Sequence, residues 1–288
     1  MNSLALRFGP FAAHLETPFG AVIDGLRLLY PDESFIDGAA FCDFHVSIAP
    51  GKFARRWIRR QAHFLIDGES PFLPLPADQA LPLFEWGLNH AIATQAHQYL
   101  VVHAAAIERG GRVAILPGAP GAGKSTLTAA LVQRGWRLLS DELALIRPAD
   151  AHVVPLARPI NLKNNSIALM RAYAPNAVFS REIHDTAKGT VALMRAPAAS
   201  VARNREAAPI GWIIFPRWQQ DAEARLAPWS KAAGLFEIAH NAMNYSLYSA
   251  AGFELLADIF ATSGCYRFTY SRLDEAVAAF AALADNAG

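Results

Sequence analysis

The stretch Arg112–Glu142 decides the fold, and it reads RVAILPGAPGAGKSTLTAALVQRGWRLLSDE. Its first residues are apolar and predict a short buried strand, whereas the run from about Ser125 to Arg134 is rich in helix-forming residues. Between them lies GAPGAGKST, residues 118–126, which matches the pattern G-x-x-x-x-G-K-[ST] of a phosphate-binding loop. Strand, glycine-rich loop and helix follow in the order that the motif requires. The sequence therefore predicts a nucleotide-binding P-loop.

The residue types of this loop suit a phosphate chain. Glycines at three positions let the backbone N–H groups converge on an anion, and the N-terminus of the following helix adds partial positive charge. Lys124 would reach the β- and γ-phosphates, and the Ser125 hydroxyl would coordinate Mg²⁺. The expected nucleotide-binding residues are Gly118, Ala119, Pro120, Gly121, Ala122, Gly123, Lys124, Ser125 and Thr126.

Two acidic residues follow the next short strand. Leu138 and Leu139 predict that strand, and Asp141 and Glu142 come at its carboxyl end. A carboxylate at the carboxyl end of a strand beside a P-loop suits a metal ligand or a general base. The alternative is that both carboxylates belong to an ordinary surface turn.

A histidine interrupts the apolar run YLVVHAAAIE, Tyr99–Glu108, which predicts another strand. A single histidine in such a strand is most often a hydrogen-bonded core residue. The next strand along the chain runs directly into the P-loop, however, and this neighbour would bring His103 to the phosphate end of the sheet. Both interpretations of His103 stand on the sequence alone.

Composition limits the classes of function. The chain has 288 residues, of which 53% are hydrophobic, and a formal net charge of +1, which gives no sign of a nucleic-acid partner. Arg7 and Pro10 interrupt the only early apolar run, so we expect no secretory signal. Without an apolar stretch of about 18 residues, we expect no membrane span and no membrane partner. Two distant cysteines fit buried thiols in a cytoplasmic enzyme.

The first part of the chain reads as a separate, β-rich region, residues 1–76, followed by a P-loop domain at 77–288. Within the first part, KFARRWIRRQAHFLI, residues 52–66, carries five basic residues that would share one face of a helix. Such a helix would suit a membrane surface, an acidic partner or a leader peptide. Turn signals on both sides favour a hairpin strand with solvated charges instead.

The remaining chain predicts alternating helices and strands. We expect a helix over 77–98 with Leu81, Phe84, Leu88 and Ile92 on one face, and strands near 190–194, 210–215, 224–227 and 265–270. Further helices are expected at about 166–171, 229–239, 245–261 and 273–283. The polar segment 174–187 reads either as a loop that holds an acceptor substrate or as an ordinary long connection.

At this point the residues carry a resemblance. His103, then GAPGAGKST, then RGWRLLSDE resemble the catalytic core of the HPr kinase/phosphorylase family. The segments RPINLKNNSI, KGTV and IIFPRW, which begin at residues 158, 188 and 213, resemble the HPr-kinase-related kinases of bacterial peptide-modification gene neighbourhoods. The resemblance covers roughly residues 77 to 270.

This resemblance implies an α/β fold of the HPr kinase and phosphoenolpyruvate carboxykinase type, with a mixed sheet and helices. It also implies transfer of the γ-phosphoryl group of ATP to a serine hydroxyl of a protein or precursor peptide. Asp141 would be the general base, and Glu142 would hold Mg²⁺ together with Ser125. His103 would support the general base or the phosphate end of the site. The residues expected to hold the transferred or acceptor phosphate are Arg158, Lys163 and Lys188.

The sequence also departs from the family. The family has Asp-Asp where this chain has Asp141 and Glu142, and no segment for the reverse phosphorylase reaction is evident. The first 75 or so residues do not match the N-terminal domain typical of the family, which leaves the assembly state, a homo-oligomer included, open. Two alternatives stay open: a kinase that acts on a small hydroxylated molecule such as serine, and a nucleotide-binding regulatory module with little turnover.

Overall fold

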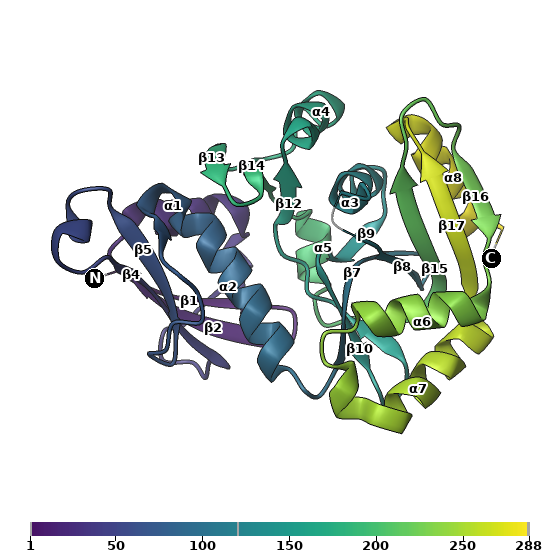
Figure 1. Cartoon of the computed structure of the whole chain (residues 1–288), viewed down its shortest axis with the longest axis horizontal. Coiled ribbons are helices and arrows are strands. Elements are labelled where there is room, and N and C mark those ends of the chain that lie inside the picture. Colours follow the sequence, from purple (N-terminus) through teal and green to yellow (C-terminus); the bar gives the residue numbers. More distant parts are fainter. Residues whose placement is uncertain (1, 120, 287–288) are drawn as a thin grey trace.

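The computed structural model describes residues 2–119 and 121–286, and its strands and helices form a mixed α/β fold. A six-stranded sheet occupies one end of the molecule and an eight-stranded sheet the other, with a small three-stranded sheet between them (Figure 1). Within the described residues, no helix is both long enough and apolar enough to cross a bilayer.

The first sheet contains the N-terminal strands in the order β3-β1-β2-β4-β5-β6. Alternate residues of its strands face the core, because successive side chains of a strand point to opposite faces; Phe44, Val46 and Ile48 of β4 are all buried. The strands are β1 (Asn2–Phe8), β2 (Phe11–Thr17), β3 (Phe35–Ile36), β4 (Phe44–Pro50), β5 (Gln61–Ile66) and β6 (Leu75–Pro76).

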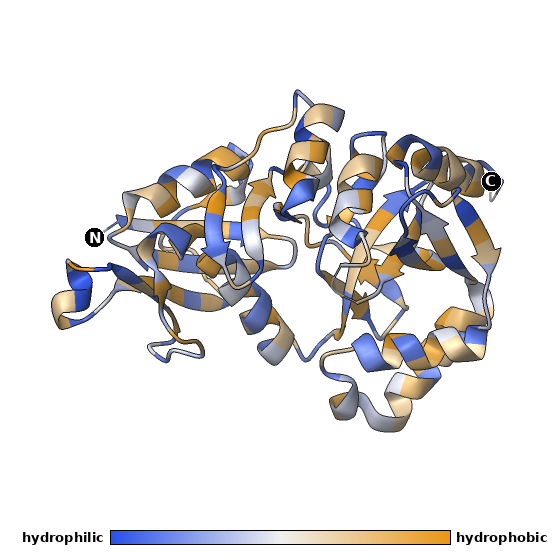
Figure 2. Ribbon diagram, turned by 45° about the horizontal axis from the view of Figure 1, so that its top comes forward, coloured by the Kyte–Doolittle hydropathy of each residue, from blue (hydrophilic) through white to orange (hydrophobic). Residues whose placement is uncertain are grey.

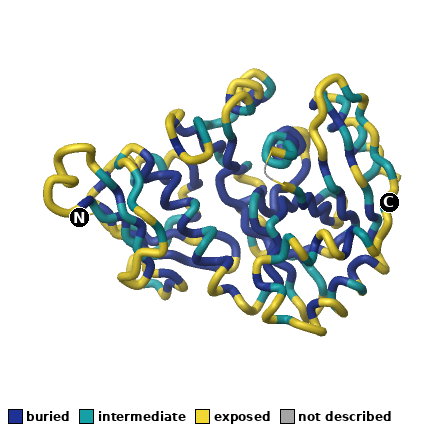
Figure 3. Tube along the Cα trace, viewed as in Figure 1, coloured by how far each residue is buried: buried dark blue, intermediate teal, exposed yellow. Residues whose placement is uncertain are grey.

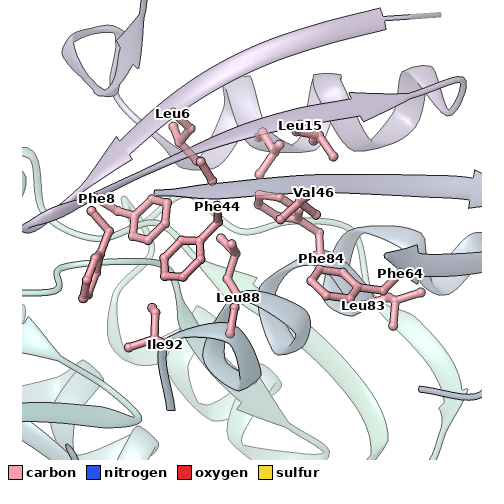
Figure 4. Close-up of a cluster of buried hydrophobic side chains, with 14 of the residues drawn as sticks. Leu6, Phe8, Leu15, Phe44, Val46, Phe64, Leu83, Phe84, Leu88 and Ile92 are labelled. Carbon is pink, nitrogen blue, oxygen red and sulfur yellow. The ribbon is translucent and has the colours of Figure 1, made fainter. Parts of the chain in front are cut away.

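Two helices, α1 (Gly20–Leu29) and α2 (Ala80–Gln95), pack on this sheet. The four apolar residues expected on one face of the second helix are all buried in the same core, and Figure 4 shows Phe84, Leu88 and Ile92 facing the side chains of the sheet. At Gly87 a Cβ atom would lie 2.1 Å from the Phe64 ring, so glycine lets the helix approach β5 closely. The predicted boundary at residue 77 falls ahead of α2, whereas α2 packs with the first sheet.

The eight-stranded sheet follows the order β11-β10-β7-β8-β15-β17-β16, and β9 pairs with β7. Because β11 pairs with both β10 and the start of β15, this part of the sheet curls back on itself. Its strands are β7 (Leu100–Arg109), β8 (Arg112–Pro117), β9 (Arg137–Ser140), β10 (Leu143–Arg147), β11 (His152–Val154), β15 (Ala208–Trp218), β16 (Arg225–Pro228) and β17 (Gly264–Tyr270).

Helices cover the curled sheet on both sides. Buried side chains of α3 and α8 share one core with the sheet, and those of α6 and α7 share another. Figure 3 shows the buried positions concentrated in these strands and on the inner sides of the helices. The helices are α3 (Lys124–Val132), α5 (Ala198–Ala202), α6 (Lys231–Asn241), α7 (Tyr245–Thr262) and α8 (Leu273–Asp285).

The small sheet contains the strand expected near residues 190–194 and part of the polar segment 174–187, for which the sequence predicted a loop or connection. It has the order β12-β14-β13 and contains β12 (Ile160–Lys163), β13 (Ile183–Thr186) and β14 (Gly189–Met194), with α4 (Asn165–Tyr173) after β12. The polar segment 174–187 thus ends in a short strand. Its pairing with β14 stabilises a stretch whose own sequence carries no strand pattern.

The structure corrects the expected hairpin strand across the basic segment. The ladder between β4 and β5 ends where the Gly51 N–H donates to the Gln61 carbonyl at 2.9 Å, and β5 begins only at Gln61. Residues Phe53–Arg56 form a single 3-10 turn instead, η2. All five basic residues therefore lie in a connection outside the sheet, where their charges need no burial.

Candidate functional site

The glycine-rich loop connects the end of β8 to the start of α3. Gly118, Gly121 and Gly123 have φ values of +150°, +86° and +90°, a range that favours glycine. The N-cap residue of α3 is Gly123, which has no side chain to cap the helix, so the first N–H groups of α3 are open to another acceptor. Pro120, one of the expected nucleotide-binding residues, lies outside the described residues.

The ends of two neighbouring strands hold this loop. The Tyr270 hydroxyl, at the end of β17, donates to the Gly123 carbonyl at 3.0 Å, and the Trp218 N–H, at the end of β15, donates to the Ala122 carbonyl at 3.1 Å. A Cβ atom at Gly123 would lie 2.4 Å from the Tyr270 hydroxyl oxygen. The loop is thus held by contacts from Tyr270 and Trp218, which no local sequence motif predicts.

Lys124 and Ser125 begin α3 and face the inside of the site. The Lys124 ammonium donates to the Gly118 carbonyl across the loop. Burial lowers the pKa of Lys124, the Asp141 carboxylate works against that shift, and the Lys163 charge adds to it. Its charge therefore lies in a partly desolvated place, where it interacts strongly with anions.

Asp141 lies directly after β9 and is 6% exposed. Its Oδ2 accepts hydrogen bonds from the Ser125 hydroxyl and from the Asn161 N–H, both at 3.1 Å, and its Oδ1 has no partner among the described residues. Burial and the neighbouring Glu142 charge raise the pKa of Asp141 from 3.8 to about 7, against the effect of the two hydrogen bonds. A carboxyl group poised near neutral pH suits proton transfer.

Glu142 has a different partner, although it follows Asp141 in the chain. Its Oε2 accepts a hydrogen bond from the Asn89 side-chain amide of α2, and no hydrogen bond joins Glu142 to Ser125 among the described residues. The Asn89 carbonyl oxygen in turn accepts from Arg158 at 2.7 Å. A carboxylate only accepts hydrogen bonds and a guanidinium only donates them. The two hydrogen bonds of Asn89, to Glu142 and from Arg158, therefore fix the orientation of its side-chain amide.

Arg158 lies in this chain of contacts and is 6% exposed. Its Nη2 is 2.6 Å from Glu85 Oε2, and the Tyr30 hydroxyl donates to Glu85 Oε1 at 2.9 Å. Burial works against the charge of Arg158, but the Glu85 carboxylate and Tyr30 raise its pKa above the usual range. The structure thus gives Arg158 a buried carboxylate and the Asn89 amide as partners, and its contact with a phosphate stays a prediction.

His103, Lys163 and Lys188, the remaining predicted site residues, lie around the acidic pair. His103 is one residue beyond the last β7–β8 pair, Ala104–Pro117, and therefore lies where β8 meets the loop. Burial lowers the pKa of His103, and the charges of Lys124, Lys163 and Lys188 lower it further, against the effect of Glu142, so we expect a neutral ring at pH 7. The Lys188 ammonium lies 4.6 Å from the centre of the Trp86 ring on α2.

A cavity of about 20 Å³ adjoins the acidic pair, which is room for about one water molecule. It is lined by Glu85, Trp86, Asn89, Ser140, Asp141, Glu142, Leu156, Arg158, Pro159, Asn161 and Leu193. The Asn161 amide is buried with neither of its polar atoms hydrogen-bonded within the described chain. Neither Asn161 nor Asn89 is among the site residues predicted from the sequence, although Asn161 lies in the RPINLKNNSI segment that carries the resemblance.

The structure brings the loop, Lys124, Ser125, Asp141, Glu142, His103, Lys163 and Lys188 to one place and sets Arg158 behind it. Among the described residues, no group of three or more His, Cys, Asp and Glu side chains is placed to hold a metal ion. Mg²⁺ typically takes only one or two carboxylates and keeps several water molecules. The buried, unpartnered Asp141 Oδ1 and the Ser125 hydroxyl offer the hard oxygen atoms that this ion requires.

Comparisons with known proteins add little to this geometry. No family model matches the sequence, and no curated protein matches it. Among solved structures, the HPr(Ser) kinase/phosphatase from Coxiella burnetii is similar, with 12% sequence identity and a TM-score of 0.26, over 64% of this chain and 96% of that chain. A similarity of this size carries no weight for fold or function, which therefore depend on the residues of this chain.

Proposed function

We propose that this chain is an ATP-dependent kinase that transfers the γ-phosphoryl group to a serine hydroxyl of a protein or precursor peptide. One observation carries the proposal: a buried carboxyl group, Asp141, lies beside the N-terminus of α3 and touches the second residue of that helix. A phosphate site and a proton acceptor are thus adjacent, which is what phosphoryl transfer to a hydroxyl requires.

The nucleotide half of the site is the glycine-rich loop. Positive φ angles at three glycines and an uncapped helix N-terminus support binding of a phosphate chain by backbone N–H groups. In our proposal the Lys124 ammonium exchanges the Gly118 carbonyl for phosphate oxygens. The preference for ATP rests on the family resemblance alone.

The acceptor half contains Asp141 as general base. A pKa raised to about 7 means that Asp141 can take a proton from a hydroxyl late in the transfer and release it near neutral pH. Lys163 and Lys188 lie near Glu142, and their positive charges would compensate the negative charge of the transferred phosphoryl group. His103, neutral at pH 7, would donate or accept a hydrogen bond beside them.

Mg²⁺ would be held by the Ser125 hydroxyl together with one carboxylate of the acidic pair. When bound, the ion would neutralise charge on the phosphate oxygens. The resemblance gives Glu142 as that carboxylate, whereas the hydrogen bond from Ser125 goes to Asp141. An experiment therefore has to separate the carboxylate that holds the ion from the carboxylate that accepts the proton.

The test is transfer of labelled γ-phosphate from ATP, with Mg²⁺, to a panel of acceptors: serine-containing peptides, HPr-like proteins and free serine. We expect labelling of a peptide or protein, and a loss of about 10²–10⁴-fold in Asp141→Asn with ATP binding retained. Lys124→Ala should lose both binding and transfer. Asp150→Asn is the matched control, because this carboxylate pairs with Arg147 on the surface.

Other outcomes would change the proposal. Labelling of free serine alone would replace the protein or peptide acceptor by a small molecule. ATP binding without any labelled acceptor would favour a nucleotide-binding regulatory module. Binding of Mn²⁺ in the presence of nucleotide, followed by electron paramagnetic resonance, separates the two carboxylates: the variant that weakens Mn²⁺ binding, Asp141→Asn or Glu142→Gln, identifies the metal ligand.

A further inference from the structure

A short exposed loop at the end of the first sheet has no role in the site. It consists of Lys52–Arg60, KFARRWIRR, and we call it the basic–apolar loop. In Figure 1 it is the dark blue projection at the left end of the molecule, far from α3, and in Figure 3 it is exposed throughout. Three large apolar side chains project from it: Phe53, Trp57 and Ile58 are 93%, 78% and 69% exposed.

The backbone of the basic–apolar loop is folded tightly. A Cβ atom at Gly51 would lie 2.8 Å from the Arg55 carbonyl oxygen, so glycine is needed where the chain turns back. Phe53 and Arg59 have φ values of +49° and +48°, a conformation that side chains of this size rarely adopt. The apolar side chains are thus presented by a defined turn, and the hydropathy colouring of Figure 2 shows apolar and charged residues side by side in it.

Positive charge surrounds the apolar side chains. The loop contains Lys52, Arg55, Arg56, Arg59 and Arg60 and no acidic residue. None of these five forms an ion pair with another described residue, whereas arginines elsewhere, such as Arg137 and Arg158, do. The Arg56 guanidinium lies 5.9 Å from the centre of the Trp57 ring, so a cation and an aromatic ring share one tip.

We propose that the basic–apolar loop docks on an anionic lipid bilayer, with Phe53, Trp57 and Ile58 in the interface and the five cations at the headgroups. The loop projects from the end of the molecule (Figure 1). A stable protein partner would need to cover about 800 Å² of this chain with good shape complementarity, which nine projecting residues do not supply. A bilayer can close around a projecting loop, and tryptophan and arginine suit its interface.

This docking is peripheral and is independent of the proposed kinase function. The expectation of no membrane partner was based on the lack of a spanning segment, but a loop that lies in the interface requires none. Cations on both sides of the apolar tip would bind headgroups while the sheet behind the loop stays in water.

The experiment is cosedimentation of the full chain with vesicles of equal parts phosphatidylcholine and phosphatidylglycerol, and with vesicles of phosphatidylcholine alone, at low salt. We expect binding to the anionic vesicles only. Phe53→Ser, Trp57→Ser and Ile58→Ser combined should abolish binding, and Arg55→Gln with Arg56→Gln should weaken it by about fivefold per arginine. Phe236→Ser with Leu247→Ser, which removes apolar side chains 70% and 62% exposed on α6 and α7, should leave binding unchanged.

Three results would overturn the proposal. The first is no binding to anionic vesicles at low salt. The second is binding that survives the triple serine substitution while circular dichroism shows a folded chain. The third is tight binding of a polyglutamate peptide that the loop substitutions abolish, without vesicle binding, which would assign the loop to an acidic protein partner.

Discussion

Two buried arginine–glutamate pairs lie near opposite ends of strand β9. The distal pair joins Arg137, at the start of β9, to Glu108 of β7, with Nε and Oε2 2.7 Å apart. The proximal pair joins Arg158 to Glu85, with Nη2 and Oε2 2.6 Å apart, and lies behind the acidic residues that follow β9. Their side chains are equally buried, at 5–7% exposure.

The two pairs differ in what they are connected to. The distal pair contacts Arg203 and Glu206, which are exposed and lie away from the site. The proximal pair continues through Asn89 to Glu142 and also reaches Tyr30, the residue directly after α1. Burial lowers the pKa of Arg137, whereas the Glu85 carboxylate more than offsets burial and raises that of Arg158. The same pair of residue types therefore stabilises packing at one end, and at the other it holds Asn89 against Glu142, the carboxylate to which our proposal gives a role in the site.

The largest effects should come from removing one arginine from each pair. Arg158→Met leaves Glu85 buried without its cation and should lower the free energy of unfolding by about 3–5 kcal/mol. Arg137→Met should cost somewhat less, because Glu108 keeps Arg203 and the Gly111 N–H. Urea unfolding measures both.

Phosphoryl transfer then separates the pairs. Measured at low temperature on the folded fraction, Arg158→Met should lose transfer because Asn89 no longer holds Glu142, and Arg137→Met should retain it. Equal losses of transfer in both variants would contradict the assignment of a positioning role to the proximal pair alone.

The second prediction concerns pH at the proximal end. Because folding raises the pKa of Asp141 from 3.8 to about 7, the folded state favours the protonated form. Its contribution to stability is therefore full below pH 4, falls as the pH rises from about 4 to about 7, and stays low above that. Asp141→Asn removes this loss and should raise the free energy of unfolding above pH 7 by up to about 4 kcal/mol.

An opposite sign is expected at Asp150. Arg147 lowers the pKa of this carboxyl group to about 2, so its contribution is present above pH 4 and is lost as the pH falls toward 2. Asp150→Asn should thus slightly destabilise the chain at neutral pH, and thermal unfolding across pH 2–9 compares the two variants. A steeper pH profile in Asp141→Asn than in the unsubstituted chain would refute the burial of this charge.

Much of the site follows from consecutive residues. The glycine-rich loop needs only residues 118–125 to be predicted, since strand, loop and helix lie next to one another in the chain. Asp141 is predictable for the same reason, because it directly follows the short strand β9. In the structure Asp141 is buried and accepts a hydrogen bond from Ser125, while its role as general base stays a prediction.

The connections behind the site are not local. Glu85 meets residues 55 and 73 positions away, and Asn89 and Glu142 are 53 positions apart. The sequence therefore predicts only a phosphate ligand at Arg158, because no sequence pattern indicates that its side chain pairs with a buried carboxylate. One signal was available: Glu85 lies four residues from Leu81, on the apolar face of its helix, and a carboxylate there needs a cation.

The third prediction compares one hydrogen-bonding side chain from each end. Asn89→Ala removes the link between Arg158 and Glu142, and Ser200→Ala removes the hydroxyl that accepts from the Leu138 N–H within β9 at 3.0 Å. Each should cost about 1–3 kcal/mol, since a buried polar group loses its partner. Only Asn89→Ala should lower phosphoryl transfer. Its maximal rate of transfer should fall, while its affinity for ATP stays unchanged. A loss of ATP affinity instead would place Asn89 at the nucleotide.

The smallest effect is expected at Tyr30, whose hydroxyl donates to Glu85 of the proximal pair. Tyr30→Phe removes one hydrogen bond to Glu85 Oε1, while Arg158 keeps Oε2, so the cost should be about 1 kcal/mol. Tyr248→Phe is the control, since its hydroxyl donates to the His97 carbonyl away from the site. If phosphoryl transfer in Tyr30→Phe stays near that of the control, Arg158 alone orients Glu85. If it falls as far as in Asn89→Ala, the Tyr30 hydroxyl is needed, together with Arg158, to keep Glu85 and Asn89 of α2 in the arrangement that positions Glu142.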